Sequence, residues 1–207
     1  MTRLYCATGN QGKLREFRMA ALHAPVEIEL IEAYKQLPPC VEDGATFEEN
    51  AIKKALHYAP HAPGPLFADD SGLEVDALGG APGVHSARYA AEAPHAAEAN
   101  TDDDENNARV LRELKGVPPE RRTGRFVCVM AAARDGTTVS TFRGAAEGVI
   151  LDGLRGAGGF GYDPMFFFPA VGKTFAELSA EEKSKYSHRG AAFRQVLEWM
   201  DQARGRE

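Results

Sequence analysis

The clearest β-hairpin signal in the chain reads RFVCVMAAARDGTTVSTFRGAAEGVIL, from Arg125 to Leu151. Two β-rich runs, at 125–133 and 138–151, flank the dipeptide Asp135-Gly136. Asp-Gly favours the tight turn that joins antiparallel strands, so these runs predict a hairpin.

Strand and helix signals alternate on both sides of this hairpin. A short apolar strand at 3–8 precedes a helical pattern in which Leu14, Phe17 and Ala21 share one face. The other predicted elements are a half-buried strand at 26–31, a helix at 46–58, a short strand at 66–68 that ends in a turn at 69–72, a short helix and ordered loop at 73–90, a helix at 106–114, a Gly-rich loop at 153–161, a short apolar stretch at 165–168 and a C-terminal helix with Phe193, Val196, Leu197 and Met200 on one face. Strand–helix units combined with a hairpin predict an α/β fold with a mixed sheet.

The chain has 207 residues, of which 43% are hydrophobic and 26% are charged. This composition predicts a single domain over residues 1–207, large enough for two lobes. The net charge of −6, without a basic stripe, argues against a nucleic-acid polymer as partner. The apolar runs fall short of the ~18 residues that span a bilayer, and the N-terminus lacks the pattern of a signal peptide. We therefore expect a cytoplasmic location and no membrane partner.

The cysteines and histidines do not predict a metal or disulfide framework. Cys6, Cys40 and Cys128 are an odd number without CxxC spacing, which predicts reduced, buried thiols. Pro60 lies between His57 and His61 and interrupts the helix that would align them, so a structural zinc site is not expected.

A first candidate site, Thr8-Gly9-Asn10-Gln11-Gly12-Lys13, lies where the first strand gives way to the first helix. Backbone N–H groups at a helix start, glycines that permit close approach and one lysine are typical of a phosphate-binding loop. Taken alone, this segment is better explained by a Gly-Asn turn with a solvated lysine, because short Gly-Lys turns are common.

A second candidate site is the start of the next helix, which reads TFEENAIKK from Thr46 to Lys54. Thr46 and Glu49 form the pattern of a capping box, and Glu49 with Lys53 is an i, i+4 pair. In the functional alternative, Glu49 faces a metal ion while a lysine one turn on reaches a phosphate. The two interpretations compete, because a carboxylate that caps its own helix is poorly free to bind metal.

The strongest local signal is Ala68-Asp69-Asp70-Ser71-Gly72. Adjacent carboxylates at a strand end are costly unless a cation lies near them. Because side chains alternate along a strand, only one of the two aspartates can face a given site. Mg²⁺ prefers one or two carboxylates plus water and phosphate oxygens, so one aspartate here and one glutamate elsewhere suffice. The alternative is a solvated turn.

The segment Gly159-Phe160-Gly161-Tyr162-Asp163-Pro164 combines flexible glycines with an aromatic side chain that can stack on a base. Gly156, Gly158 and Gly161 also spell GxGxxG. A dinucleotide-dependent oxidoreductase is nevertheless excluded, because Tyr-Asp-Pro follows in place of a helix.

Lys183 and the segment Ser187-His188-Arg189 complete the set of candidates. Lys183 and His188 would lie about 140° apart on one continuous helix, so they share a face only if the chain breaks between them. Ser187 as the N-cap of a new helix would supply this break. The alternative for His188-Arg189 is the start of a surface helix.

Five motifs, in this order, resemble the inosine triphosphate pyrophosphatase family, also called Ham1-like proteins. They are TGNQGKLREF (8–17), TFEENAIKKA (46–55), ADDSGLEVDALGGAPGVHSARYA (68–90), GGFGYDPMF (158–166) and EEKSKYSHRGAA (181–192). The resemblance covers essentially the whole chain. Only the Ala- and Asp-rich stretch at 91–105 has no place in it, and we interpret this stretch as a mobile surface insertion.

The resemblance implies an elongated α/β fold with two lobes around a central cleft, and a homodimer. It implies Mg²⁺-dependent hydrolysis of deaminated purine nucleoside triphosphates (ITP, dITP, XTP) to the monophosphate and pyrophosphate. Asp70 is implied as Mg²⁺ ligand and proton acceptor, and Glu49 as a second metal ligand. The implied substrate-binding residues are Thr8, Gly9, Asn10, Gln11, Gly12, Lys13, Lys54, Ser71, Phe160, Gly161, Tyr162, Asp163, Lys183, His188 and Arg189.

Base selection is expected to depend on hydrogen-bond donors that meet a purine 6-oxo group and reject a 6-amino group, with discrimination of about 10²-fold or more. Guanine also carries a 6-oxo group, so its rejection needs a second feature. Two alternatives stay open: a Maf-like pyrophosphatase of other base specificity, and a non-catalytic nucleotide-binding module. The FGYDP and SHR motifs argue against the first, and the presence of Asp70, Glu49 and Lys13 argues against the second.

Overall fold

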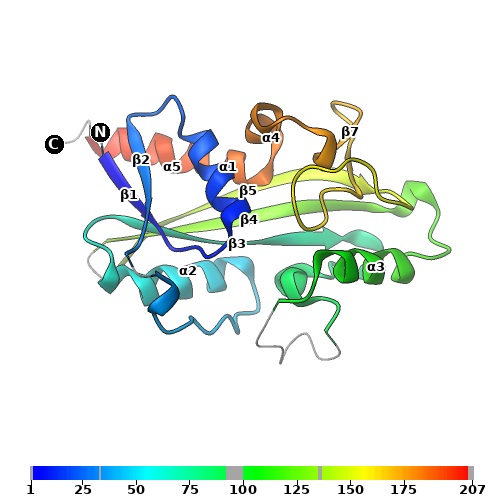
Figure 1. Cartoon of the computed structure of the whole chain (residues 1–207), viewed down its shortest axis with the longest axis horizontal. Coiled ribbons are helices and arrows are strands. Elements are labelled where there is room, and N and C mark those ends of the chain that lie inside the picture. Colours follow the sequence, from blue (N-terminus) through cyan, green and yellow to red (C-terminus); the bar gives the residue numbers. More distant parts are fainter. Residues whose placement is uncertain (1, 33, 92–99, 135–136, 205–207) are drawn as a thin grey trace. The chain divides into compact units, whose positions relative to one another are not determined.

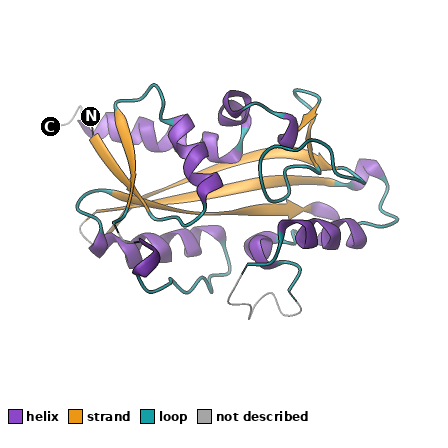
Figure 2. Cartoon of the chain, viewed as in Figure 1, coloured by secondary structure: helices purple, strands orange, loops and turns teal. Residues whose placement is uncertain are grey.

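The computed structural model describes residues 2–32, 34–91, 100–134 and 137–204. Figure 2 shows long strands accompanied by helices. The strands are β1 (Thr2–Cys6), β2 (Val26–Leu30), β3 (Leu66–Val75), β4 (Thr123–Arg134), β5 (Thr137–Ile150), β6 (Phe166–Phe168) and β7 (Lys173–Thr174). The α-helices are α1 (Gln11–Ala20), α2 (Phe47–Tyr58), α3 (Asp103–Glu113), α4 (Ala180–Tyr186) and α5 (His188–Arg204). Short 3₁₀ turns, such as Asp76–Leu78 and Gly83–Arg88, connect several of them.

One mixed sheet contains the strands in the order β2-β1-β3-β4-β5-β6-β7. Strand β1 runs parallel to β2 and β3, whereas β6 runs antiparallel to β5 and β7. Parallel strands need helical crossovers and antiparallel neighbours need only short turns, so both connection types in the sequence are accounted for. The predicted α/β fold with a mixed sheet is confirmed.

The chain divides into two compact units. Unit 1 comprises residues 1–70, 128–144 and 184–207, and unit 2 comprises 71–127 and 145–183. Strand β3 belongs to both, because the division falls between Asp70 and Ser71.

Unit 1 has helices on both faces of its strands, with α1 and α5 on one face and α2 on the other (Figure 1). Three fully buried rings form the centre of the α1–α5 side: the centroid of Phe67 on β3 lies 5.1 Å from that of Phe17 on α1 and 5.6 Å from that of Phe193 on α5. Burial of such large apolar side chains is the main stabilising contribution at this face.

Unit 2 has a separate apolar core. Phe126 stacks on Phe175 at 5.5 Å between ring centroids, and Phe166 meets both rings. Residues from β3, α3, β5 and the 162–166 segment complete this cluster. The core thus packs α3 and the segment that follows the Gly-rich loop into the same unit.

Two predicted boundaries were wrong. Strand β3 does not end at Ala68 but continues through Asp69, Asp70, Ser71 and Gly72 to Val75, so the predicted turn at 69–72 is absent. Helix α3 begins at Asp103 with Asp102 as its N-cap, three residues before the predicted start. The acidic run is therefore a helix start rather than part of an insertion, since negative charge is favourable in a first helical turn.

Several expectations fall on or near the residues that are not described. The predicted turn at 135–136 and most of the insertion, at 92–99, lie outside the described residues. Within the described residues, no helix is long and apolar enough to cross a membrane. All three cysteines are free thiols, and Cys6 and Cys128 are buried as predicted, but Cys40 is only half-buried.

Candidate active site

The carboxyl end of β1 lies beside the first residues of the parallel strand β3 in unit 1. Cys6 pairs with Phe67, and the amide of Ala7 donates to the carbonyl of Phe67 at 3.0 Å. The loop from Thr8 to Asn10 leaves β1 at this edge, next to the point where β3 presents its two aspartates. Ligands of α/β sheets bind beyond the carboxyl ends of parallel strands, so the loop that follows β1 is a natural position for a site.

Asp69 and Asp70 point to opposite faces of the sheet. Asp69 shares the face of Phe67, which packs on α1, and it forms an ion pair with Lys13 of α1. Asp70 contacts α2 instead, through Asn50 and Lys54. The predicted alternation is confirmed, and the alternative of a solvated turn is wrong, because only 3% of Asp69 and 7% of Asp70 is exposed.

Asp69 is an ionised carboxylate held by cations. Its Oδ2 lies 2.8 Å from Nζ of Lys13, whose side chain is 16% exposed. Burial alone would raise the pKa of Asp69, but the positive charges of Lys13, Lys54 and Arg189 outweigh it and leave the pKa below its ordinary value. Asp69 therefore stays charged at neutral pH and holds Lys13 in place.

Asp70 has the opposite electrostatic character. Its Oδ2 accepts a hydrogen bond from Nδ2 of Asn50 at 3.1 Å, and its Oδ1 lies 3.3 Å from Nζ of Lys54. Burial raises the pKa of Asp70 above its ordinary value, and Lys54 and Lys13 offset only part of this effect. A buried carboxylate with a raised pKa is a better proton acceptor than a solvated one, which fits the role implied for Asp70.

Lys54 joins Asp70 to a second carboxylate. Its Nζ lies 2.8 Å from Oε2 of Glu42, while the side chain is almost fully buried. Burial would lower the pKa of Lys54, but Asp70 and Glu42 raise it above the ordinary value, so the ammonium persists. The structure thus gathers Glu42, Lys54 and Asp70 at one position.

The loop between β1 and α1 is shaped by its own polar side chains. The Asn10 side chain caps α1 by accepting the amide of Lys13 at 3.1 Å, and Oγ1 of Thr8 accepts the amide of Asn10 at 3.1 Å. Gly9, Asn10 and Gln11 are exposed, whereas Thr8 and Gly12 are buried. The predicted combination of an exposed loop, a helix start and a lysine is present, and Lys13 is an ion-pair partner rather than a solvated side chain.

Glu49 takes the helix-capping role that competed with metal binding. Its amide donates to Oγ1 of Thr46 at 3.1 Å, and its Oε2 accepts the amide of Ala45 at 2.7 Å. The next residue, Asn50, reaches Asp70, but the Glu49 carboxylate faces its own helix start. Glu49 as a metal ligand stays a prediction, and Glu42 is the glutamate that shares a lysine with Asp70.

The predicted break before the last helix is confirmed. Helix α4 ends at Tyr186, and Oγ of Ser187 accepts the amide of Gly190 at 3.0 Å in the first turn of α5. His188 and Arg189 are buried, so the alternative of a surface helix start is wrong. Arg189 pairs with Glu16 of α1 at 3.1 Å, which brings the start of α5 to α1.

In unit 2, the predicted base-binding segment is built around Asp163. Its Oδ2 accepts the amide of Phe160 at 2.9 Å and forms a short, buried ion pair with Lys183. The ammonium of Lys183 lies 4.9 Å from the centroid of the Phe160 ring, a cation–π distance. The phenolic hydroxyl of Tyr162 donates to the carbonyl of Ser86 at 2.7 Å, and Ser71, the remaining candidate of unit 2, is half-buried.

Sequence reasoning missed three residues that contact the candidate site residues. Asn50 lies next to Glu49 in a motif that was singled out, but an asparagine in a helix carries no visible charge signal. Asp69 was considered only as the neighbour of Asp70. Glu42 follows a Pro-rich stretch without periodicity, and its only sequence signal is the dipeptide Glu42-Asp43 twelve residues before Lys54.

Comparison with known proteins gives a consistent result. A model of the Ham1 family matches residues 4–199. The dITP/XTP pyrophosphatase of Syntrophobacter fumaroxidans is 50% identical to this chain, and the match covers 95% of this chain and 84% of that protein. The dITP/XTP pyrophosphatase of Geobacter sulfurreducens is also 50% identical, and the match covers 93% of each chain. A solved Ham1 protein of Staphylococcus aureus is similar with a TM-score of 0.81 at 36% identity, over 98% of this chain and 100% of that one. A HAM1 protein of Coxiella burnetii gives 0.82 at the same identity and the same coverage.

Proposed function

Because the chain belongs to the Ham1 family, we propose that it hydrolyses deaminated purine nucleoside triphosphates (dITP, ITP and XTP) to the monophosphate and pyrophosphate. The observation that carries this proposal is the pair of buried, oppositely directed aspartates of β3, one holding Lys13 at the phosphate loop and the other joined to Lys54 and Glu42. Relatives named dITP/XTP pyrophosphatase support the same substrates.

The residues around Asp70 fit Mg²⁺ as an ion that arrives with the triphosphate. Asp70 and Glu42 bring carboxylate oxygens to one position, marked by their shared contact with Lys54. In the described part of the chain, no three His, Cys, Asp or Glu side chains form a cage for a metal ion. Phosphate oxygens and water would complete the coordination, as is usual for Mg²⁺.

We propose Asp70 and Glu42 as the residues that hold Mg²⁺, with Glu49 as the alternative second ligand. Bound there, Mg²⁺ would neutralise phosphate charge and lower the pKa of the attacking water. Asp70 then accepts the proton of the water that attacks the α-phosphorus. The new bond joins the water oxygen to that phosphorus, and the bond to the bridging oxygen breaks, so pyrophosphate leaves with the electron pair.

The lysines of unit 1 contribute fixed positive charge. Lys13, held by Asp69, lies at the loop that would receive the phosphate chain, together with the buried Arg189. Preorganised cations stabilise the charge that develops on the leaving pyrophosphate without a reorganisation cost during reaction. No protein nucleophile is needed for this chemistry.

Recognition of the base would involve the Phe160–Asp163 segment and Lys183. The Phe160 ring offers a stacking surface, and the Lys183 ammonium beside it is a donor for the 6-oxo group of a deaminated purine. A 6-amino group in the same position would bring donor against donor, and this mismatch costs about 10²-fold or more in kcat/KM.

A direct assay tests the proposal. Purified protein with Mg²⁺ is incubated with dITP, XTP, dATP and dGTP, and pyrophosphate and orthophosphate are measured separately. Pyrophosphate release with preference for dITP and XTP is expected. Orthophosphate release, or equal rates on dATP and dITP, would contradict it, and a preference for another base would favour a Maf-like enzyme.

Two variants distinguish an enzyme from a binding module. Asp70→Asn is expected to retain nucleotide binding and to lose nearly all turnover, whereas Arg3→Gln, an exposed control on β1, should keep full activity. Turnover of Asp70→Asn close to that of the unaltered protein would refute the assigned proton acceptor.

We further propose that the protein is a homodimer located in the cytoplasm. Light scattering would test the oligomeric state, and cell fractionation would test the location.

A further inference from the structure

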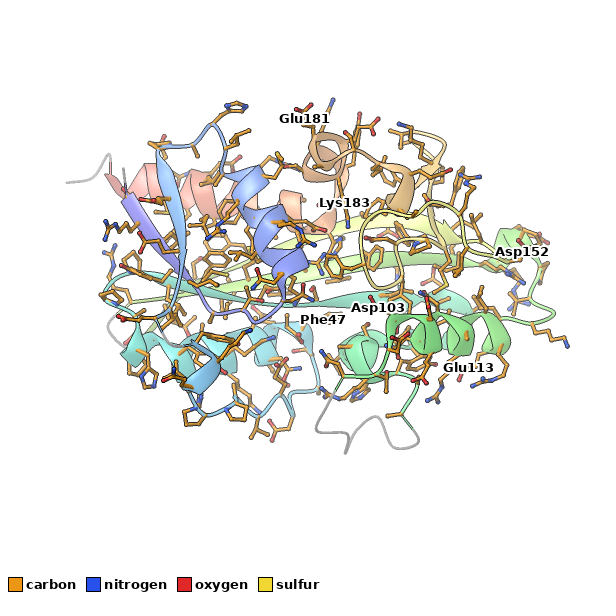
Figure 3. All side chains as sticks on the ribbon, in the orientation of Figure 1. Phe47, Asp103, Glu113, Asp152, Glu181 and Lys183 are labelled. Carbon is orange, nitrogen blue, oxygen red and sulfur yellow. The ribbon has the colours of Figure 1, made fainter. Side chains whose placement is uncertain are left out.

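Helix α3 holds both polar groups of the Gly161 backbone. Oδ2 of Asp103 accepts the amide of Gly161 at 2.7 Å, and Nδ2 of Asn107 donates to its carbonyl at 3.0 Å. Asp103 and Asn107 are four residues apart, so they lie on the same face of α3 and act on one peptide segment together. Figure 3 shows Asp103 at the start of α3.

Gly161 needs such a support because its backbone is in the left-handed region, with φ of +61°. Glycine enters this region without steric penalty, but it also has the greatest freedom to leave it. The two hydrogen bonds restrict that freedom at the centre of the Phe160–Asp163 segment.

The neighbours of Gly161 are the groups assigned to the base. On one side is the Phe160 ring beneath the Lys183 ammonium, and on the other are Tyr162 and the buried Asp163. A rotation of the Gly161 peptide would therefore change the direction of both the stacking ring and the carboxylate that holds Lys183. All of these residues belong to unit 2.

We propose that Asp103 and Asn107 are positioning residues that set base selectivity by fixing the Gly161 backbone. This inference rests on the proposed function, because it assumes that the Phe160–Asp163 segment and Lys183 read the purine. It also gives the acidic run at 102–105 a role: Asp102 caps α3 and Asp103 reaches the base-binding segment.

The chain offers a matched pair of variants. Asp103→Ala removes the acceptor of the Gly161 amide, whereas Asp104→Ala removes the same charge from the same exposed helix turn without that contact. Both changes remove one negative charge from the first turn of α3, so a difference between them reports on the contact of Asp103 with Gly161. Asp103→Asn keeps an oxygen that can accept the hydrogen bond and serves as the rescue variant.

The readout is the ratio of kcat/KM for dITP to that for dATP, with thermal unfolding measured in parallel. In Asp103→Ala we expect this ratio to fall about tenfold, mainly through a higher KM for dITP, because a fixed donor geometry discriminates better than a mobile one. Asp104→Ala should change the ratio by less than about twofold, and Asp103→Asn should restore most of it.

Three results would overturn the inference. The first is an equal loss of activity on both nucleotides in Asp103→Ala, which indicates a purely structural contact. The second is the same change of ratio in Asp104→Ala. The third is an unaltered protein without preference for dITP over dATP, which defeats the proposed function itself and is visible before any variant is made.

Discussion

Replacing Asp69 by asparagine should lower the free energy of unfolding much more than replacing Asp70, although the two residues are adjacent. Asp69 has a pKa below its ordinary value, because Lys13 and other cations outweigh its burial, so its charge stabilises the fold. Asp70 has a pKa above its ordinary value, because burial outweighs Lys54, so its charge opposes folding at neutral pH.

The structure sets the size of each effect. Removing one partner of a fully buried ion pair costs about 3–5 kcal/mol. Because 16% of the Lys13 side chain is exposed and water can reach its ammonium, we expect about 2 kcal/mol for Asp69→Asn. In Asp70→Asn, Lys54 keeps Glu42 at 2.8 Å, so stability should change by less than about 1 kcal/mol or increase.

Urea denaturation followed by fluorescence measures both values. The chain has one tryptophan, Trp199, which packs near Phe142 in unit 1, the unit that contains both aspartates. An unchanged m-value would show that the variants unfold in the same way as the unaltered protein. The destabilisation by Asp69→Asn should persist at neutral pH and shrink only below about pH 4, where the carboxylate protonates.

One result would refute this reasoning: a loss of stability in Asp70→Asn equal to or larger than that in Asp69→Asn. It would mean that the Asp70 charge is stabilised by its partners more than burial opposes it. A gap between Asp69→Asn and the unaltered protein that grows with acid would contradict the sign of the Asp69 shift.

Three further predictions follow from other contacts. Glu42→Gln should raise the Mg²⁺ concentration that gives half-maximal activity about tenfold, and Glu49→Gln should raise it less. Initial rates measured over a range of Mg²⁺ concentrations test this, and the reverse order of the two variants would favour Glu49 as the metal ligand. Ser187→Ala should lower the free energy of unfolding by about 1 kcal/mol through loss of the α5 cap, and a change below about 0.3 kcal/mol would show that the cap is dispensable. In a thiol-reagent assay, Cys40 should react fastest under native conditions, because it is only half-buried whereas Cys6 and Cys128 are buried. Burial raises the pKa of all three thiols, so access of the reagent decides the order, and equal rates for all three would contradict the burial of Cys6 and Cys128.

Features that depend on local chemistry could be predicted from the sequence. Thr46 and Ser187 cap helices because a hydroxyl reaches an amide three residues on, and these patterns are complete within a few letters. The opposite orientation of Asp69 and Asp70 follows from strand geometry alone. The family motifs added the roles that geometry could not supply.

Features that depend on distant partners could not be predicted. The sequence Asp-Asp-Ser-Gly looks like a turn because these residues are rare in strand interiors. In the structure Lys13 pairs with Asp69, and Asn50 and Lys54 contact Asp70, and these partners offset the cost of burying the two carboxylates. Glu42 is revealed only by its contact with Lys54. Asp103 looked like part of an acidic surface until its contact with Gly161, 58 residues away, was visible.

The alternation along β3 has a further implication for how this chain can vary. Phe67 faces the aromatic core, Asp69 faces α1 and Asp70 faces α2. The position of each residue along the strand, odd or even, therefore decides which face of the sheet its side chain occupies. Adding or deleting one residue between Phe67 and Asp69 would place Phe67 and Asp69 on opposite faces, so either the ring or the two carboxylates would face the wrong helix. A single replacement here alters one contact, whereas a change of length by one alters the contacts of every residue on one side of it.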